Sequence, residues 1–162
     1  MTPRPLATAP AIPPAAAGSV PVFLYGTLTD PDVLARVLGR PLRPGELEPA
    51  RLDGFRRRRA AAASYPVLVP APDATVDGLL LHPASDRDVR RLNHFESGEY
   101  HAELRPVRTR DGVTRPAWLY AARADLPVSA EAWRPEDWRR RHLADFLPAC
   151  DAWMADCRED EG

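Results

Sequence analysis

Two short stretches of the sequence carry residues whose types and spacing could support chemistry. The first is the turn Tyr25-Gly26-Thr27-Leu28, which follows an apolar run and precedes a predicted helix. Glycine lets a backbone approach a ligand closely, and the start of a helix directs N–H groups and a positive dipole end at such a turn. The pattern therefore indicates a site for an anionic group such as a carboxylate. The alternative is an ordinary turn at the end of a buried strand, which is the more common role of such a glycine.

The second stretch is centred on Glu96, which ends a predicted helix directly after the apolar Phe95. The C-terminal end of the helix dipole is negative and disfavours a carboxylate there. If the carboxyl group is also partly buried, its pKa should rise toward neutrality, a useful property for a general base. The residue pattern alone leaves open the alternative of a solvated surface glutamate.

Several other kinds of site are absent from the sequence. It contains no Walker loop and no G-x-G-x-x-G, G-x-S-x-G or H-E-x-x-H motif. The four histidines and two cysteines show no metal-ligand spacing. All 22 basic residues are arginines, which excludes a lysine nucleophile. The formal net charge of −1 gives no reason to expect nucleic acid or a membrane surface as a partner.

Proline dominates the N-terminal segment. Residues 1–21 contain six prolines and no aromatic residue, too little apolar surface to offset the entropy of ordering. We therefore expect residues 1–19 to be a disordered Pro/Ala-rich tail, and its prolines interrupt any secretory signal. Cys150 and Cys157 would lie about 10 Å apart along a helix, beyond the ~7 Å reach of a disulfide. Free thiols suit a reducing compartment, so we expect a cytoplasmic protein.

The elements that must position the two stretches follow from the apolar pattern. Strands are predicted at 20–25, 65–70 and 75–81, and a hairpin at 99–109 and 113–122 around an Asp-Gly turn. One helix is predicted to begin at Pro31, capped by Thr29 or Asp30, and to end at Gly39, and a second lies between Ser85 and Ser97. The arginine quartet at 56–59 is expected on a solvated edge strand.

A long helix is predicted from Pro135 to about Cys157, kinked or split by Pro148, with residues 123–134 as a loop before it. An apolar stripe along this helix is interpreted as core packing. The stripe consists of Trp138, His142, Phe146, Ala149 and Trp153, widened by Leu143, Leu147, Cys150 and Met154.

Strands and helices without regular β-α-β alternation predict an α+β fold. We expect a small, mostly antiparallel β-barrel or curled sheet with flanking helices and a long C-terminal helix. A chain of 162 residues suits one core. Residues 20–122 would form the main domain, and residues 123–162 a loop and helical extension packed on it.

Five short motifs, taken in order, resemble those of the gamma-glutamylcyclotransferase-like superfamily, which includes gamma-glutamylamine cyclotransferases and avirulence-induced-gene-like proteins. The resemblance covers about Val20 to Ala122. Asn93 and Ser97 depart from the usual Asp and Gly, and Ala102 stands where an arginine is common. The motifs are Tyr25-Gly26-Thr27-Leu28, Tyr65-Pro66, Val76-Asp77-Gly78-Leu79, Leu92-Asn93-His94-Phe95-Glu96-Ser97 followed by Tyr100, and Ala117-Trp118-Leu119-Tyr120.

The resemblance implies an enzyme that releases 5-oxoproline from a gamma-glutamyl amine or peptide, because the substrate's alpha-amine attacks its own gamma-carbonyl. It implies Glu96 as the catalytic acid and base, and it implies no metal or other cofactor. The residues implied in substrate binding are Tyr25, Gly26, Thr27, Leu28, Tyr65, Tyr100 and Tyr120, although the tyrosines are equally consistent with core aromatics.

The implied partner is a small gamma-glutamyl molecule. The amine that leaves would be bound by variable loops, here 40–50, 70–75 and 123–134. The sequence is silent on oligomeric state, and a monomer is favoured. Two other functions remain open: a non-catalytic small-ligand-binding protein on the same fold, and a related acyl transferase or hydrolase.

Overall fold

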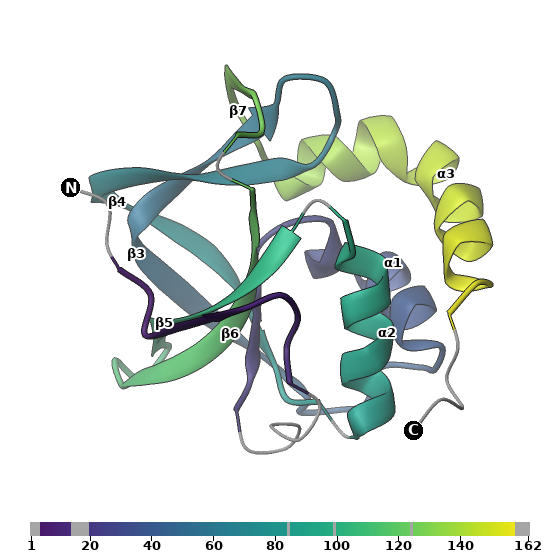
Figure 1. Ribbon diagram of the computed structural model, residues 1–162, viewed down its shortest axis with the longest axis horizontal. Coiled ribbons are helices and arrows are strands. Elements are labelled where there is room, and N and C mark those ends of the chain that lie inside the picture. The colour runs from purple at the N-terminus through teal and green to yellow at the C-terminus, as the bar shows by residue number, and fades with distance from the viewer. Residues whose placement is uncertain (1–3, 14–19, 84, 99, 124, 158–162) are drawn as a thin grey trace.

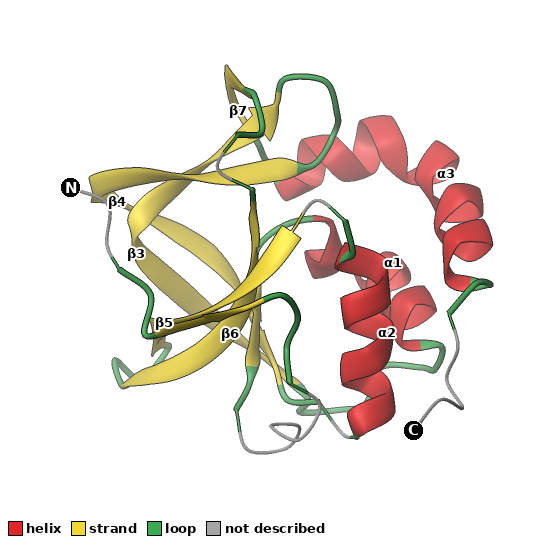
Figure 2. Cartoon of the chain, in the orientation of Figure 1, coloured by secondary structure: helices red, strands yellow, loops and turns green. Residues whose placement is uncertain are grey.

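Strands wrap into a barrel, and the helices gather on one side of it (Figure 1). The computed structural model describes residues 4–13, 20–83, 85–98, 100–123 and 125–157. Figure 2 shows the division into strands and helices. In chain order the elements are β1 (Ala7–Ala9), β2 (Val22–Leu24), the 3-10 turn η2 (Thr27–Thr29), α1 (Pro31–Leu38), β3 (Leu47–Ala60), β4 (Pro66–Leu81), α2 (Asp86–Glu96), β5 (Tyr100–Thr109), β6 (Thr114–Ala122), β7 (Val128–Ala132) and α3 (Pro135–Met154).

Five of these strands close the barrel. The order β5-β6-β2-β4-β3 is completed by pairing of β3 back to β5. Strands β2 and β6 pair in parallel, whereas the other ladders are antiparallel. Strand β1 extends the sheet beyond β5, and β7 extends it beyond β3. The predicted α+β class with a small, mostly antiparallel barrel is confirmed.

The long β3–β4 hairpin replaces two shorter predicted strands. The predicted strands at 65–70 and 75–81 fall on one continuous strand, β4, which begins at Pro66, and the segment before it forms β3. Gly78 allows β4 to approach β2, because a Cβ atom at this position would lie 2.3 Å from the carbonyl oxygen of Leu24. Glycine is therefore required at position 78 by the close approach of the two strands.

Local capping explains where two of the helices begin and end. The carboxylate of Asp30 accepts hydrogen bonds from the N–H groups of Asp32 and Val33, which fixes the start of α1. Gly39 ends α1 in the left-handed conformation, with φ of 69°. Ser85 caps the start of α2 through the N–H of Asp88. These boundaries confirm the predicted ones.

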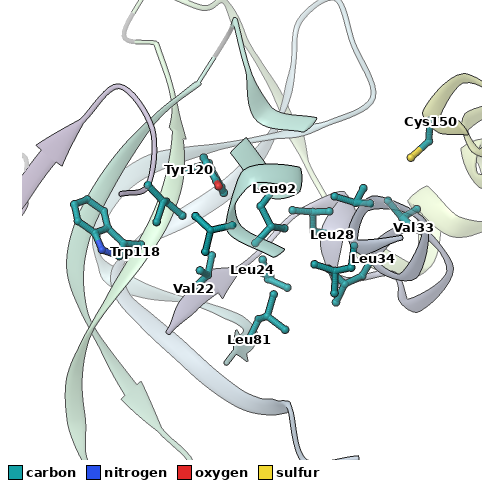
Figure 3. Close-up of a cluster of buried hydrophobic side chains, with 14 of the residues drawn as sticks. Val22, Leu24, Leu28, Val33, Leu34, Leu81, Leu92, Trp118, Tyr120 and Cys150 are labelled. Carbon is teal, nitrogen blue, oxygen red and sulfur yellow. The ribbon is translucent and has the colours of Figure 1, made fainter. Parts of the chain in front are cut away.

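The core has two layers because side chains alternate along each strand. On β2, Phe23 points to the inside of the barrel, whereas Val22 and Leu24 face the helices. Figure 3 shows this second layer, in which Leu24 lies between Leu92 of α2 and Leu81 of β4. The helices are thereby held against one side of the barrel.

The C-terminal helix α3 departs in part from its interpretation as core packing. It changes direction along its length (Figure 1), as expected for a helix that contains Pro148. Trp138 and Cys150 are buried, but His142 and Ala149 are exposed, and Trp153 is 45% exposed. None of the described helices is long and apolar enough to cross a membrane.

The N-terminal segment was expected to be a disordered tail, and the structure differs for residues 4–13. Strand β1 pairs with β5 from Ala7 opposite Leu104 to Ala9 opposite Ala102, and Ile12 is buried in the core. Backbone pairing to the part of β5 that β3 leaves unpaired needs few apolar side chains, so composition did not reveal it. Residues 1–3 and 14–19 lie outside the described part of the chain.

The edge-strand prediction for arginines 56–59 is wrong. Strand β7 lies in the segment predicted as a loop and pairs with β3 between Arg58 and Ala60. Its sequence, Val-Ser-Ala-Glu-Ala, is short, mostly exposed and poor in the β-branched and aromatic residues that mark a strand. Arg57 is half-buried, with its guanidinium 5.4 Å from the centre of the Trp133 ring.

Candidate active site

A cavity of about 400 Å³ lies where the barrel meets α2 and α3. All the residues proposed for the site from the sequence line it. They are Glu96, Tyr25, Gly26, Thr27, Leu28, Tyr65, Tyr100 and Tyr120. The two stretches that the sequence presents separately, the glycine turn and the glutamate, therefore face one cavity.

The glycine turn connects β2 to η2 and is fixed from several directions. The N–H and hydroxyl groups of Thr29 donate to the carbonyl oxygen of Gly26 at 2.9 and 2.6 Å. The guanidinium of Arg57 donates to the carbonyl oxygen of Tyr25 at 2.9 Å. A Cβ atom at Gly26 would lie 3.0 Å from Cγ of Pro66, so glycine leaves room for the start of β4. The backbone that lines the cavity is held rigidly.

The N-terminal, positive end of α1 was expected to bind an anionic group of a ligand, and the structure differs. The carboxylate of Asp30 occupies it, and Arg139 of α3 binds the same carboxylate at 2.6 Å. The chain thus supplies its own anion at this helix start. The donors left for a ligand at the turn are the backbone N–H groups of residues 26–28, since the first N–H groups of a helical turn have no partner within it.

Glu96 is the last residue of α2 and is partly buried. Burial raises the pKa of its carboxyl group to about 8. Burial also raises the pKa of Tyr25 and Tyr120, and the nearby charge of Glu96 raises both further. Glu96 is therefore not a solvated surface glutamate: it lies in an apolar setting close to two phenols.

The tyrosines form two groups around the cavity. The hydroxyl of Tyr25 donates to the carbonyl oxygen of Tyr120 at 2.5 Å, and the hydroxyl of Tyr120 donates to Oδ1 of Asn93 at 2.7 Å. The rings of Tyr65 and Tyr100 meet edge to face, with their centres 5.8 Å apart. The tyrosines therefore fit both interpretations: they pack on one another, as core aromatics do, and they line the cavity, as substrate-binding residues would.

Sequence reasoning missed the wall that α3 contributes. Phe146, Ala149, Cys150 and Trp153 line the cavity, whereas none of the described residues of 40–50, 70–75 and 123–134 does. The helical stripe showed that these side chains share a face, but it could not distinguish a core beneath them from a cavity. Among the residues that the structure describes, no three His, Cys, Asp or Glu side chains gather to hold a metal ion.

Comparison with known proteins agrees with this geometry. Residues 22–140 match the family described as "Gamma-glutamyl cyclotransferase, AIG2-like". The Arabidopsis thaliana AIG2-like protein A is 30% identical over 129 residues, which cover 78% of this chain and 76% of the relative. AIG2-like protein B from the same plant is 26% identical over 144 residues, covering 87% and 81%.

Solved structures share the fold. A solution structure of an Arabidopsis thaliana protein superposes with a TM-score of 0.60 at 25% identity, covering 80% of this chain and 78% of the other. A structure of a gamma-glutamyl cyclotransferase superposes with a TM-score of 0.52 over 88% of this chain and 90% of the other. At 13% identity, the second likeness concerns the fold alone.

Proposed function

The chain belongs to the gamma-glutamyl cyclotransferase, AIG2-like family, and from that premise we propose that it is an enzyme that releases 5-oxoproline from a gamma-glutamyl amine or peptide. The observation that carries the proposal is the placement of Glu96. A partly buried carboxyl group with a pKa of about 8 faces the same cavity as the backbone of Gly26 to Leu28.

Glu96 is suited to accept the first proton. The alpha-amine of a gamma-glutamyl group is mostly protonated at neutral pH and must be neutral to attack. An acceptor whose pKa is raised toward that of the amine takes the proton at a lower free-energy cost than an ordinary carboxylate, which is too weak a base. Burial of Glu96 therefore brings its pKa closer to the value that the reaction needs.

The remaining steps require geometry and further proton transfers. The neutral amine forms a C–N bond to the gamma-carbonyl carbon, and the carbonyl oxygen becomes an oxyanion. Backbone N–H groups of residues 26–28 are the candidate donors to the substrate carboxylate or to this oxyanion. Protonated Glu96 then gives its proton to the departing nitrogen as the original C–N bond breaks. The ring nitrogen still carries the second proton of the attacking amine, and the regenerated Glu96 carboxylate accepts that proton and passes it to the released amine. The products are 5-oxoproline and a free amine.

Ring closure is favoured if the glutamyl chain is held folded. An intramolecular attack that forms a five-membered ring gains most from positioning. Tyr25, Tyr65, Tyr100 and Tyr120 surround the cavity and are proposed to hold that folded conformer.

The described cysteines, Cys150 and Cys157, are both free thiols, which supports a cytoplasmic location.

Product identity tests the function. Purified protein is incubated with gamma-glutamyl amides, gamma-glutamyl peptides and glutathione, and the products are identified by mass. Equal amounts of 5-oxoproline and amine are expected from at least one substrate. Release of glutamate in place of 5-oxoproline would identify a hydrolase, and saturable binding without any product would identify a non-catalytic binding protein.

A further inference from the structure

One wall of the cavity is apolar and comes from the helices. It consists of Phe95 at the end of α2 and Phe146, Ala149, Cys150 and Trp153 of α3. Among the described residues that line the cavity, Glu96 alone carries a charged side chain. The cavity therefore has a polar end, at the glutamate and the glycine turn, and an apolar end beneath α3.

The aromatic side chains of this wall are fixed in place. The ring of Phe146 meets Trp138 edge to face at 5.1 Å and Phe95 at 6.2 Å. The ring of Trp153 stacks on His94 at 5.0 Å. Two hydrogen bonds join the same pair: the indole N–H donates to the carbonyl oxygen of His94 at 3.1 Å, and Nε2 of His94 donates to the carbonyl oxygen of Trp153 at 2.9 Å. A wall fixed in this way loses little entropy when a ligand binds.

The polarity of the two ends orients a substrate. A gamma-glutamyl group carries its charges at the alpha-carbon, and these belong at the polar end beside the glycine turn. The group on the far side of the amide then lies along the wall of α3. A carboxylate on that group, as in a gamma-glutamyl peptide, would enter an apolar region without a cation, and burial of an unpaired charge is strongly unfavourable.

The volume of the cavity limits the size of the leaving group. Ligand pockets of small molecules measure roughly 300–1,000 Å³, and about 400 Å³ lies near the lower limit. The glutamyl group fills part of this space, which leaves room for a leaving group of about one ring. Ring edges and faces at the wall favour an aromatic partner over an aliphatic chain of equal area.

We propose that the leaving group is an amine that bears an aromatic ring and no further charged group, joined through its nitrogen to the gamma-carboxyl, and that Phe146 and Trp153 are the residues that select it. This inference rests on the proposed cyclotransferase function. It specifies the class of leaving amine, which the motifs in the sequence do not identify.

The test compares kcat/KM for 5-oxoproline release from gamma-glutamyl benzylamide, gamma-glutamyl methylamide and gamma-glutamylglycine. The benzylamide is expected to exceed gamma-glutamylglycine by about 100-fold. Phe146→Ala and Trp153→Ala are each expected to lower the ratio of benzylamide to methylamide by about tenfold. The control Val113→Ala, on the exposed turn between β5 and β6, should leave the ratio unchanged.

A variant that adds charge tests the same wall without removing a buried side chain. Ala149 is exposed yet lines the cavity, so arginine fits there without overpacking. Ala149→Arg should raise the ratio of gamma-glutamylglycine to benzylamide by about tenfold, since the guanidinium pairs with the carboxylate. Ala144→Arg, on an exposed part of α3 outside the cavity lining, is the matched control.

The outcomes separate the two proposals. Turnover in which gamma-glutamylglycine equals or exceeds the benzylamide overturns the inference and leaves the cyclotransferase function standing. An unchanged ratio in both Phe146→Ala and Ala149→Arg also overturns it. No 5-oxoproline from any of the three substrates overturns the inference, and the proposed function is overturned with it only if the other gamma-glutamyl peptides and glutathione also give none.

Discussion

The side chain of Asn93 binds the backbone of Ile12 through both groups of its carboxamide. Its Oδ1 accepts from the N–H of Ile12 at 3.0 Å, and its Nδ2 donates to the carbonyl oxygen of Ile12 at 2.9 Å. The same Oδ1 accepts from the hydroxyl of Tyr120. One residue of α2 thus holds the N-terminal segment beside a tyrosine that lines the cavity.

Replacing Asn93 with Asp should destabilise the protein. The carboxylate keeps the two acceptor contacts but loses the donor to Ile12, and it places a charge against that carbonyl oxygen. A loss of about 1–3 kcal/mol in the free energy of unfolding is expected. Urea unfolding at pH 7 measures it, with Asp73→Asn on the exposed part of β4 as the control. Equal stability of Asn93→Asp and wild type would contradict the role assigned to the carboxamide.

The departure of Asn93 from the usual Asp and the ordering of residues 4–13 turn out to be connected. In the sequence, Asn93 is a departure from the usual Asp of a family motif. The Pro/Ala-rich segment has too few apolar residues to predict that it packs on the core. Neither sequence pattern predicts the contact between Asn93 and Ile12, because a contact between residues 81 positions apart depends on how the chain folds. The short motifs were more informative: caps and glycine stops at Asp30, Gly39 and Ser85 are local, and they appear where predicted.

Stability should depend on pH through Glu96. Its carboxyl has a pKa of about 8 in the folded protein, against an ordinary value of 4.5. Between these values the folded state keeps a proton that the unfolded state has lost, so the free energy of unfolding falls as pH rises from 4.5 to 8. Glu96→Gln cannot ionise and should therefore become more stable than wild type as pH rises, by on the order of 3 kcal/mol at pH 8.

Urea unfolding of both proteins at pH 4.5, 6 and 8 measures this difference. The two should be about equally stable at pH 4.5. Glu136→Gln, which removes an exposed carboxylate at the start of α3, is the control and should show no such gain. A constant difference between Glu96→Gln and wild type across the three pH values would show that the carboxyl does not titrate as a buried group.

Substitution of Gly78 should disrupt the contact between β2 and β4. An added Cβ atom meets the carbonyl oxygen of Leu24 at 2.3 Å and Phe23 at 2.7 Å, and neither the backbone nor a core ring can move away easily. Gly78→Ala is expected to cost about 3 kcal/mol or more. Gly45→Ala adds its Cβ atom in open space at a positive φ, so it should cost only about 1–2 kcal/mol. Thermal unfolding would contradict this account if the two variants had equal melting temperatures.

The wall of α3 marks the limit of prediction from the sequence. Helical spacing places Phe146, Ala149 and Trp153 on one face, but core packing and cavity lining require the same spacing. Trp153 is held to His94 across 59 positions of sequence, and this contact fixes the end of α3 over the cavity. Strand β7 was missed for a different reason: it is short and mostly exposed, and backbone pairing to β3 holds it in place.

Glu96→Gln tests the central claim most directly. The amide keeps the size and polarity of the protonated side chain but cannot accept or return a proton. If Glu96 moves the proton, wild-type kcat/KM for 5-oxoproline release should rise with pH to a plateau above about 8. At that plateau, Glu96→Gln should be slower by about 10²- to 10⁴-fold. A Glu96→Gln enzyme that forms 5-oxoproline at the wild-type rate would contradict the account.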